Sequence, residues 1–219
     1  MFKNRLNIDR IKSERTDPAN AIGTASFLRL ETAVTTTQNA INFNVLQNVG
    51  TSQATEQRLK QTDMFTITDF AVYVYKTDAT TVTSGSIAHL YSNPNPQVFT
   101  GTGEANNLMA VWNGLLQISV DRKQVVPGMD VLRTYRVGTS QKGVGSSAAN
   151  NNPVQFDEWQ GPNYAFASVD PEITISGSGQ TDISIQLPTA VSLAGTSSTN
   201  YVVVMFRGIL WQSASSAAQ

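Results

Sequence analysis

The chain has 219 residues, no cysteine and a single histidine, and its 15 basic and 16 acidic residues give a net charge of −1. The absence of cysteine excludes disulfides and thiolate metal sites, and one histidine excludes zinc sites built from several histidines. Only 14% of the residues are charged, whereas 76 are Ser, Thr, Asn or Gln. Such a polar but weakly charged surface favours contact between copies of the chain, because few charges lose water when it is buried.

Residues 1–20 are predicted to form an arm outside the main domain. The basic residues of this arm are Lys3, Arg5, Arg10, Lys12 and Arg15. With Asp9 and Glu14 they give residues 1–15 a net charge of 5 − 2 = +3, and a Thr-Asp-Pro sequence then interrupts any helix. The arm could make weak contacts with nucleic acid, dock on a neighbouring subunit or be an ordinary solvated terminus.

The start of the chain shows no apolar secretory-signal pattern. The longest apolar stretch covers residues 201–206. That is far short of the roughly 20 residues that a membrane-spanning helix needs, so no transmembrane segment is expected.

Residues 21–212 are predicted to form one β-rich domain. Residues 25–31 alternate loosely, and residues 40–46 alternate strictly, with Ile41, Phe43 and Val45 on one face. A short helical turn is expected over residues 56–60. The clearest strand covers residues 65–75, where the alternation changes phase and predicts a bulge near Asp69.

The middle of the chain contains several turn signals between apolar runs. Residues 87–91 read as a short strand, and the Asn-Pro-Asn-Pro sequence at 93–96 reads as a turn. Asn113-Gly114 predicts a hairpin that pairs residues 108–112 with 115–120, and a helix over 105–116 is the alternative. Turns are expected at residues 121–123 and 127–128, followed by a strand over 131–137 that bears Arg133 and Arg136.

The last third combines loops with three further strands. Residues 138–153 are rich in Gly, Ser and Asn and predict a long flexible loop within the domain. Strands are expected over 172–175, 183–187 and 201–211, the last buried on both faces, and residues 213–219 form a small-residue tail. Nine or ten short strands at this spacing predict an all-β fold, an antiparallel β-sandwich.

The sequence contains little that predicts an enzyme, and no catalytic residue, metal site or cofactor is predicted. His89 lies in an apolar run, where a lone histidine is more often packed than catalytic. Asp157-Glu158 could serve a glycosidase, but adjacent carboxylates usually point apart, and Asp170-Pro171-Glu172 reads as a turn.

The three tryptophans fall into two groups. Trp112 and Trp211 lie in apolar runs and are expected in the core. Trp159 has polar neighbours and is a candidate interface anchor, since tryptophan is enriched at binding hot spots. Local packing remains an equally good explanation for Trp159.

The chain resembles viral and bacteriophage capsid proteins of the jelly-roll type. The residues that carry this resemblance are the charged arm at 3–15, the Ser/Thr/Asn/Gln-rich body, the segment 173–188 with its Gly/Ser turn, and the apolar strand 201–207. The resemblance implies a single jelly roll with an extended N-terminal arm, acting as a virion protein assembled in the host cytoplasm. Its partners would be copies of itself and other virion proteins. The alternative is a phage fibre, spike or carbohydrate-binding β-sandwich that recognises a receptor or glycan.

Overall fold

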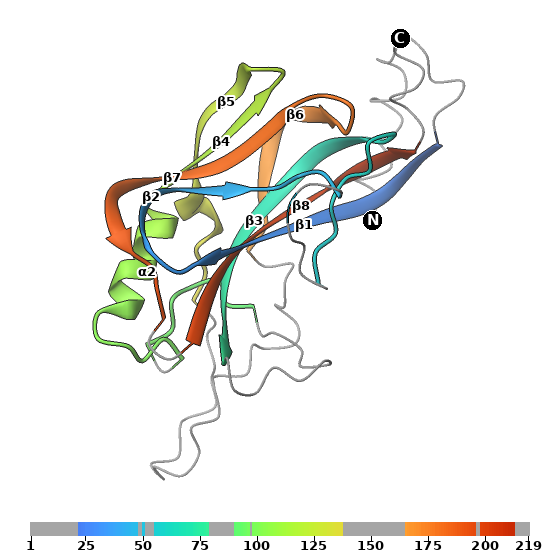
Figure 1. Ribbon diagram of the computed structural model, residues 1–219. Helices are drawn as coiled ribbons and strands as arrows, with labels where there is room; N and C mark the ends of the chain where they lie inside the picture. Colours follow the sequence, from blue (N-terminus) through green and yellow to red (C-terminus); the bar gives the residue numbers. More distant parts are fainter. Residues whose placement is uncertain are drawn as a thin grey trace.

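The computed structural model describes residues 22–47, 50, 55–78, 90–96, 98–137, 165–195 and 198–212. Their strands form an antiparallel β-sandwich of two four-stranded sheets (Figure 1). The first sheet has the order β1 (Ile22–Val34), β8 (Ser198–Gln212), β3 (Met64–Asp78) and β6 (Ala167–Ser176). The second has the order β2 (Thr37–Phe43), β7 (Thr181–Ser192), β4 (Leu115–Val120) and β5 (Lys123–Asp130). The predicted all-β sandwich is therefore confirmed.

The strands pair in a nested order, in which the first strand of the chain pairs with the last, the second with the second to last, and so on. β1 pairs with β8, β2 with β7, β3 with β6 and β4 with β5, all antiparallel. The β3·β8 and β4·β7 pairs join these into sheets. Consecutive strands alternate between the two sheets except at the β4–β5 hairpin. The chain therefore crosses from one sheet to the other at all the remaining connections between strands.

The main core lies between the sheets and comes from the period-two faces of the strands. In β2 and just after it, Ile41, Phe43 and Val45 are buried as predicted, while Asn42 and Asn44 are exposed. The final strand is buried on both faces at its centre, because Val202, Val203 and Val204 are each 0% exposed. This central position between β1 and β3 explains its continuous apolar run.

The predicted bulge in β3 is confirmed. The pairing of β3 with both neighbours shifts register between Ile67 and Asp69. Gly208 of β8 lies opposite Ile67, and a Cβ atom there would meet the Thr66 carbonyl oxygen at 1.7 Å. The backbones thus approach too closely for any side chain at residue 208.

The hairpin predicted at Asn113-Gly114 is wrong, and the alternative helix is present as α2 (Glu104–Trp112). Leu108, Val111 and Trp112 are buried at helical spacing. The backbone N–H of Asn113 donates to the carbonyl of Met109, so the Asn-Gly pair ends a helix instead of joining two strands.

The next turns also differ in part from expectation. The turn predicted at residues 121–123 is confirmed, since Asp121 and Arg122 have φ angles of 49° and 63° and join β4 to β5. Residues 127–128, where a turn was predicted, lie instead within β5. β5 is an edge strand, and a proline whose nitrogen faces the unpaired side of such a strand removes no hydrogen bond from the sheet. The strand predicted at 131–137 is instead a 3-10 helix, η1 (Val131–Thr134), which Asp130 caps by accepting a hydrogen bond from the Leu132 N–H.

The turn predicted at Asp170-Pro171-Glu172 lies inside β6. The pairing of β6 with β3 is interrupted there, because Ser168 pairs with Asp69 and the next paired residue of β6 is Ile173. The arm at 1–20, the loop at 138–153 and the tail at 213–219 lie outside the described residues, as does most of the strand predicted at 87–91.

Candidate functional site

Most residues singled out from the sequence lie outside the described part of the chain. These are Lys3, Arg5, Arg10, Lys12, Arg15, His89, Asp157, Glu158 and Trp159. Trp112 and Trp211 are 0% and 1% exposed, which confirms that both belong to the interior. The indole N–H of Trp211 donates to Thr66 Oγ1 at 2.9 Å. Both tryptophans are therefore structural.

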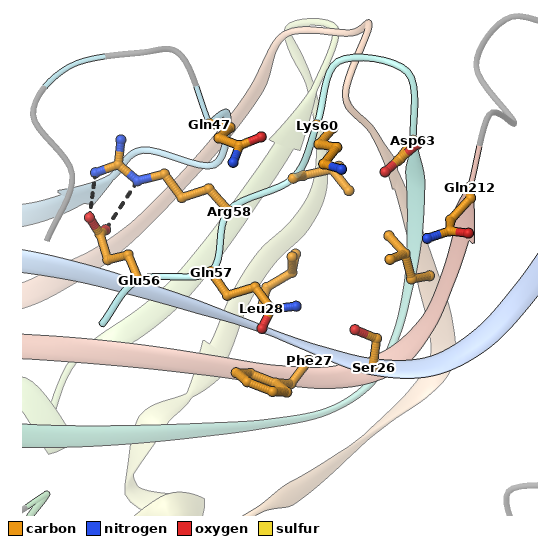
Figure 2. Close-up of a pocket in the computed structure, with 12 residues that line it drawn as sticks. Ser26, Phe27, Leu28, Gln47, Glu56, Gln57, Arg58, Lys60, Asp63 and Gln212 are labelled. Atoms are coloured by element: carbon orange, nitrogen blue, oxygen red, sulfur yellow. Dashed lines mark hydrogen bonds and ion pairs between the residues drawn. The ribbon is translucent and has the colours of Figure 1, made fainter. Parts of the chain in front are cut away.

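A groove with a volume of about 300 Å³ opens at the edge of the sandwich beside β1 (Figure 2). Its lining comes from the first half of β1, from Gln47, from residues 56–60, from Asp63 and from the end of β8. Ile22 and Gln212 pair across the β1·β8 ladder, so the groove lies where β1 begins and β8 ends.

One wall of the groove is the edge segment, residues 55–60, which links the edges of the two sheets. Gln57 exchanges two backbone hydrogen bonds of 2.9 Å with Arg29 of β1. Two residues later, the Leu59 N–H donates to the Val45 carbonyl at 2.8 Å and the Leu59 carbonyl accepts from Gln47 at 3.0 Å. The helical turn predicted at 56–60 is therefore wrong, because both sheet edges offer backbone partners that hold these residues extended.

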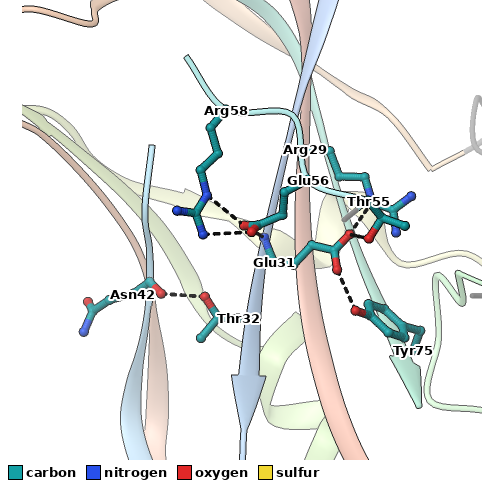
Figure 3. A network of polar contacts seen from close by, with 8 residues as sticks. All are labelled: Arg29, Glu31, Thr32, Asn42, Thr55, Glu56, Arg58 and Tyr75. Atoms are coloured by element: carbon teal, nitrogen blue, oxygen red, sulfur yellow. Dashed lines mark hydrogen bonds and ion pairs between the residues drawn. The ribbon is translucent and has the colours of Figure 1, made fainter. Parts of the chain in front are cut away.

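Two buried carboxylates fasten the edge segment to β1 (Figure 3). Glu56 forms a two-point ion pair with Arg58, at 3.1 Å from Nε and 2.8 Å from Nη2, and also accepts from the Glu31 N–H at 2.9 Å. The exposed fractions of these two side chains are only 1% for Glu56 and 3% for Arg58. The pair is thus removed from solvent screening.

Glu31 is the centre of the other half of the network. Its carboxylate accepts from Arg29 Nε at 2.6 Å, Thr55 Oγ1 at 2.7 Å and the Tyr75 hydroxyl at 2.5 Å. Burial, followed by the hydrogen bond to Glu31, raises the pKa of Tyr75 above its ordinary value. The Glu31 side chain is 0% exposed, so this carboxylate has a structural role and no access to a substrate.

A second buried polar cluster fixes the start of α2. Glu104 accepts from the Gly101 N–H at 2.7 Å, from Lys76 Nζ at 3.1 Å and from Asn200 Nδ2 at 2.8 Å. These donors come from the preceding loop, β3 and β8. The cluster ties the helix to the first sheet.

The groove is the candidate binding site among the described residues. Its apolar lining includes Leu28, Leu59 and Leu210. Besides the Glu56–Arg58 ion pair, its polar side chains are Ser26, Gln47, Gln57, Lys60, Asp63 and Gln212. In the described ranges, no group of three or more Asp, Glu, His or Cys side chains is placed to hold a metal ion. The arrangement suits non-covalent recognition of a polar ligand.

Sequence reasoning missed this groove. Residues 56–60 contain one apolar residue, Leu59, and so lack the alternation of apolar and polar side chains that would predict an extended segment. The segment is held extended by backbone partners from distant residues, Arg29, Val45 and Gln47.

Comparisons with protein-family models, with curated proteins and with solved structures found no match. In the part of the chain that the structure covers, no helix has the length and apolar character needed to cross a membrane.

Proposed function

We propose that this chain is a jelly-roll subunit that assembles into a virus or bacteriophage capsid. The observation that carries the proposal is the nested pairing of the eight strands, 1 with 8, 2 with 7, 3 with 6 and 4 with 5, in two four-stranded sheets. This pairing supports the proposal, because an eight-stranded double sheet is what a jelly roll predicts, and capsid and lectin domains use that architecture.

The composition of the surface favours the capsid function within that group. Charged residues make up 14% of the chain, so contacts between subunits would bury few charges. Large apolar side chains are also exposed on the second sheet and beside it, where Leu115, Val125 and Leu132 are 45%, 48% and 45% exposed. Burying these side chains against another copy would remove apolar surface from water and so contribute to association.

The test is the mass of the purified protein by light scattering after size exclusion, with negative-stain images of the peak. We expect closed particles of many subunits. A monomer or a small ring or trimer under all assembly conditions would contradict the proposal and favour the receptor-binding or glycan-binding alternative.

Gly208→Val is the matched control for non-specific aggregation. A valine at residue 208 would collide with the Thr66 carbonyl and separate β8 from β3. Regular particles should therefore disappear in this variant. If the variant yields the same particles as the wild type, they do not depend on the sandwich and the proposal fails.

A further inference from the structure

Several polar side chains of the groove make no side-chain hydrogen bond to another described residue. These are Ser26, Gln47, Gln57, Lys60 and Gln212. Figure 2 shows Ser26, Gln57 and Gln212 around the same opening, on different sides of it. A small number of placed polar groups is what fixes the orientation of a ligand in a small-molecule site.

The chemistry of these groups matches the hydroxyls of a sugar. A glutamine side chain offers hydrogen-bond donors on its nitrogen and an acceptor on its oxygen, and a serine hydroxyl can both donate and accept. A sugar hydroxyl also donates and accepts, so one hydroxyl can form hydrogen bonds with two of these side chains. The side chain of Phe27 alternates along β1 with those of Ser26 and Leu28 and points to the other side of the strand, so recognition would rest on the polar groups.

The charges of the groove favour an uncharged ligand. The guanidinium of Arg58 is engaged by Glu56, so it is not available to a phosphate or carboxylate. Asp63 is 6% exposed and accepts from Thr62 Oγ1 at 3.0 Å. Glu56 and Arg58 cancel each other's charge, so the carboxylate of Asp63 and the exposed ammonium of Lys60 are the remaining charges of the groove, and they are opposite in sign.

The volume sets the size of the ligand. About 300 Å³ is at the lower end of the range for small-molecule sites. One or two sugar rings would occupy it.

We propose that the groove between β1 and the edge segment binds one or two rings of an uncharged saccharide through Gln57, Gln212 and Ser26. The proposal is independent of capsid assembly, because it rests on the groove of a single subunit. It assigns this chain a recognition site for neutral glycans.

The experiment is saturation-transfer difference NMR on the full-length protein, with lactose, maltose and cellobiose as probes and sialic acid as the charged comparator. We expect transfer to at least one neutral disaccharide and weaker transfer to sialic acid. Gln57→Ala and Gln212→Ala should each weaken binding by roughly three- to tenfold, the effect of losing one neutral hydrogen bond.

Gln124→Ala is the matched control, because Gln124 is an exposed glutamine on β5, at the far edge of the other sheet. It should leave binding unchanged, and unchanged melting temperatures should show that all three variants fold. The proposal is overturned if no neutral disaccharide binds, if binding survives both groove variants, or if sialic acid binds more tightly than the neutral sugars.

Discussion

Tyr73 and Tyr75 are buried on the outer face of the first sheet. Both lie on β3 and are 2% and 4% exposed, packed with Val203 in a small cluster separate from the main core. Tyr75 also stacks on Tyr201 with ring centroids 4.8 Å apart. Burial raises the pKa of both hydroxyls above the ordinary tyrosine value.

These shifted pKa values predict a loss of stability at alkaline pH. Because the folded-state pKa is raised, the stabilisation is fully present below the unfolded pKa of about 10 and is lost as pH rises toward the folded value. Each such tyrosine should steepen the decline of the unfolding free energy by up to about 1.4 kcal/mol per pH unit.

Denaturant titrations at successive pH values above the unfolded pKa would measure this decline. Tyr73→Phe should make it shallower, since phenylalanine has no proton to lose. An identical slope in wild type and variant would show that Tyr73 titrates normally in the folded protein.

At the scale of elements, the edge segment depends on the Glu56–Arg58 ion pair. Breaking a buried pair from one side leaves the other charge without compensation, which typically costs about 3–5 kcal/mol. Glu56→Gln retains an acceptor for the Glu31 N–H, so a destabilisation of about 2–4 kcal/mol is expected.

Urea unfolding of Glu56→Gln would measure this cost. The double variant Glu56→Gln/Arg58→Met removes both charges and should recover part of the loss. If the unfolding free energy of Glu56→Gln lies within about 0.5 kcal/mol of the wild-type value, the substitution behaves like an ordinary surface change, and a structural role for the ion pair is contradicted.

Elements whose signal is local were predictable from the sequence. The phase change between Ile67 and Phe70 predicted the β3 bulge, because period two is a property of the strand itself. Asn113-Gly114 was misread because this pair can form a hairpin or end a helix, and only the contacts of Leu108 and Trp112 decide. The groove was not predictable, since its walls are β1, the edge segment and the end of β8, which meet only in the folded chain.

At the scale of the whole molecule, the nested pairing leaves two sheet edges of different character. The edge segment bridges the side formed by β1 and β2 through backbone hydrogen bonds to residues in and after those strands. On the other side, the edge strands are β5 and β6. Pro127 in β5 and the interrupted ladder of β6 limit pairing with other chains there. In the proposed capsid, contacts between copies should therefore use side chains more than added strands.

The same nesting imposes an order on folding. The β4–β5 pair joins neighbouring strands, whereas β1 pairs with β8 across nearly the whole chain, and closing that loop first would cost the most entropy. Each inner pair shortens the effective loop that the next pair must close. Pulse-labelled hydrogen exchange should find β4 and β5 amides protected before those of β1, and protection of β1 first would contradict this order. The strands that border the groove would thus be completed last, and a mutation there would mainly speed unfolding, with little effect on the folding rate.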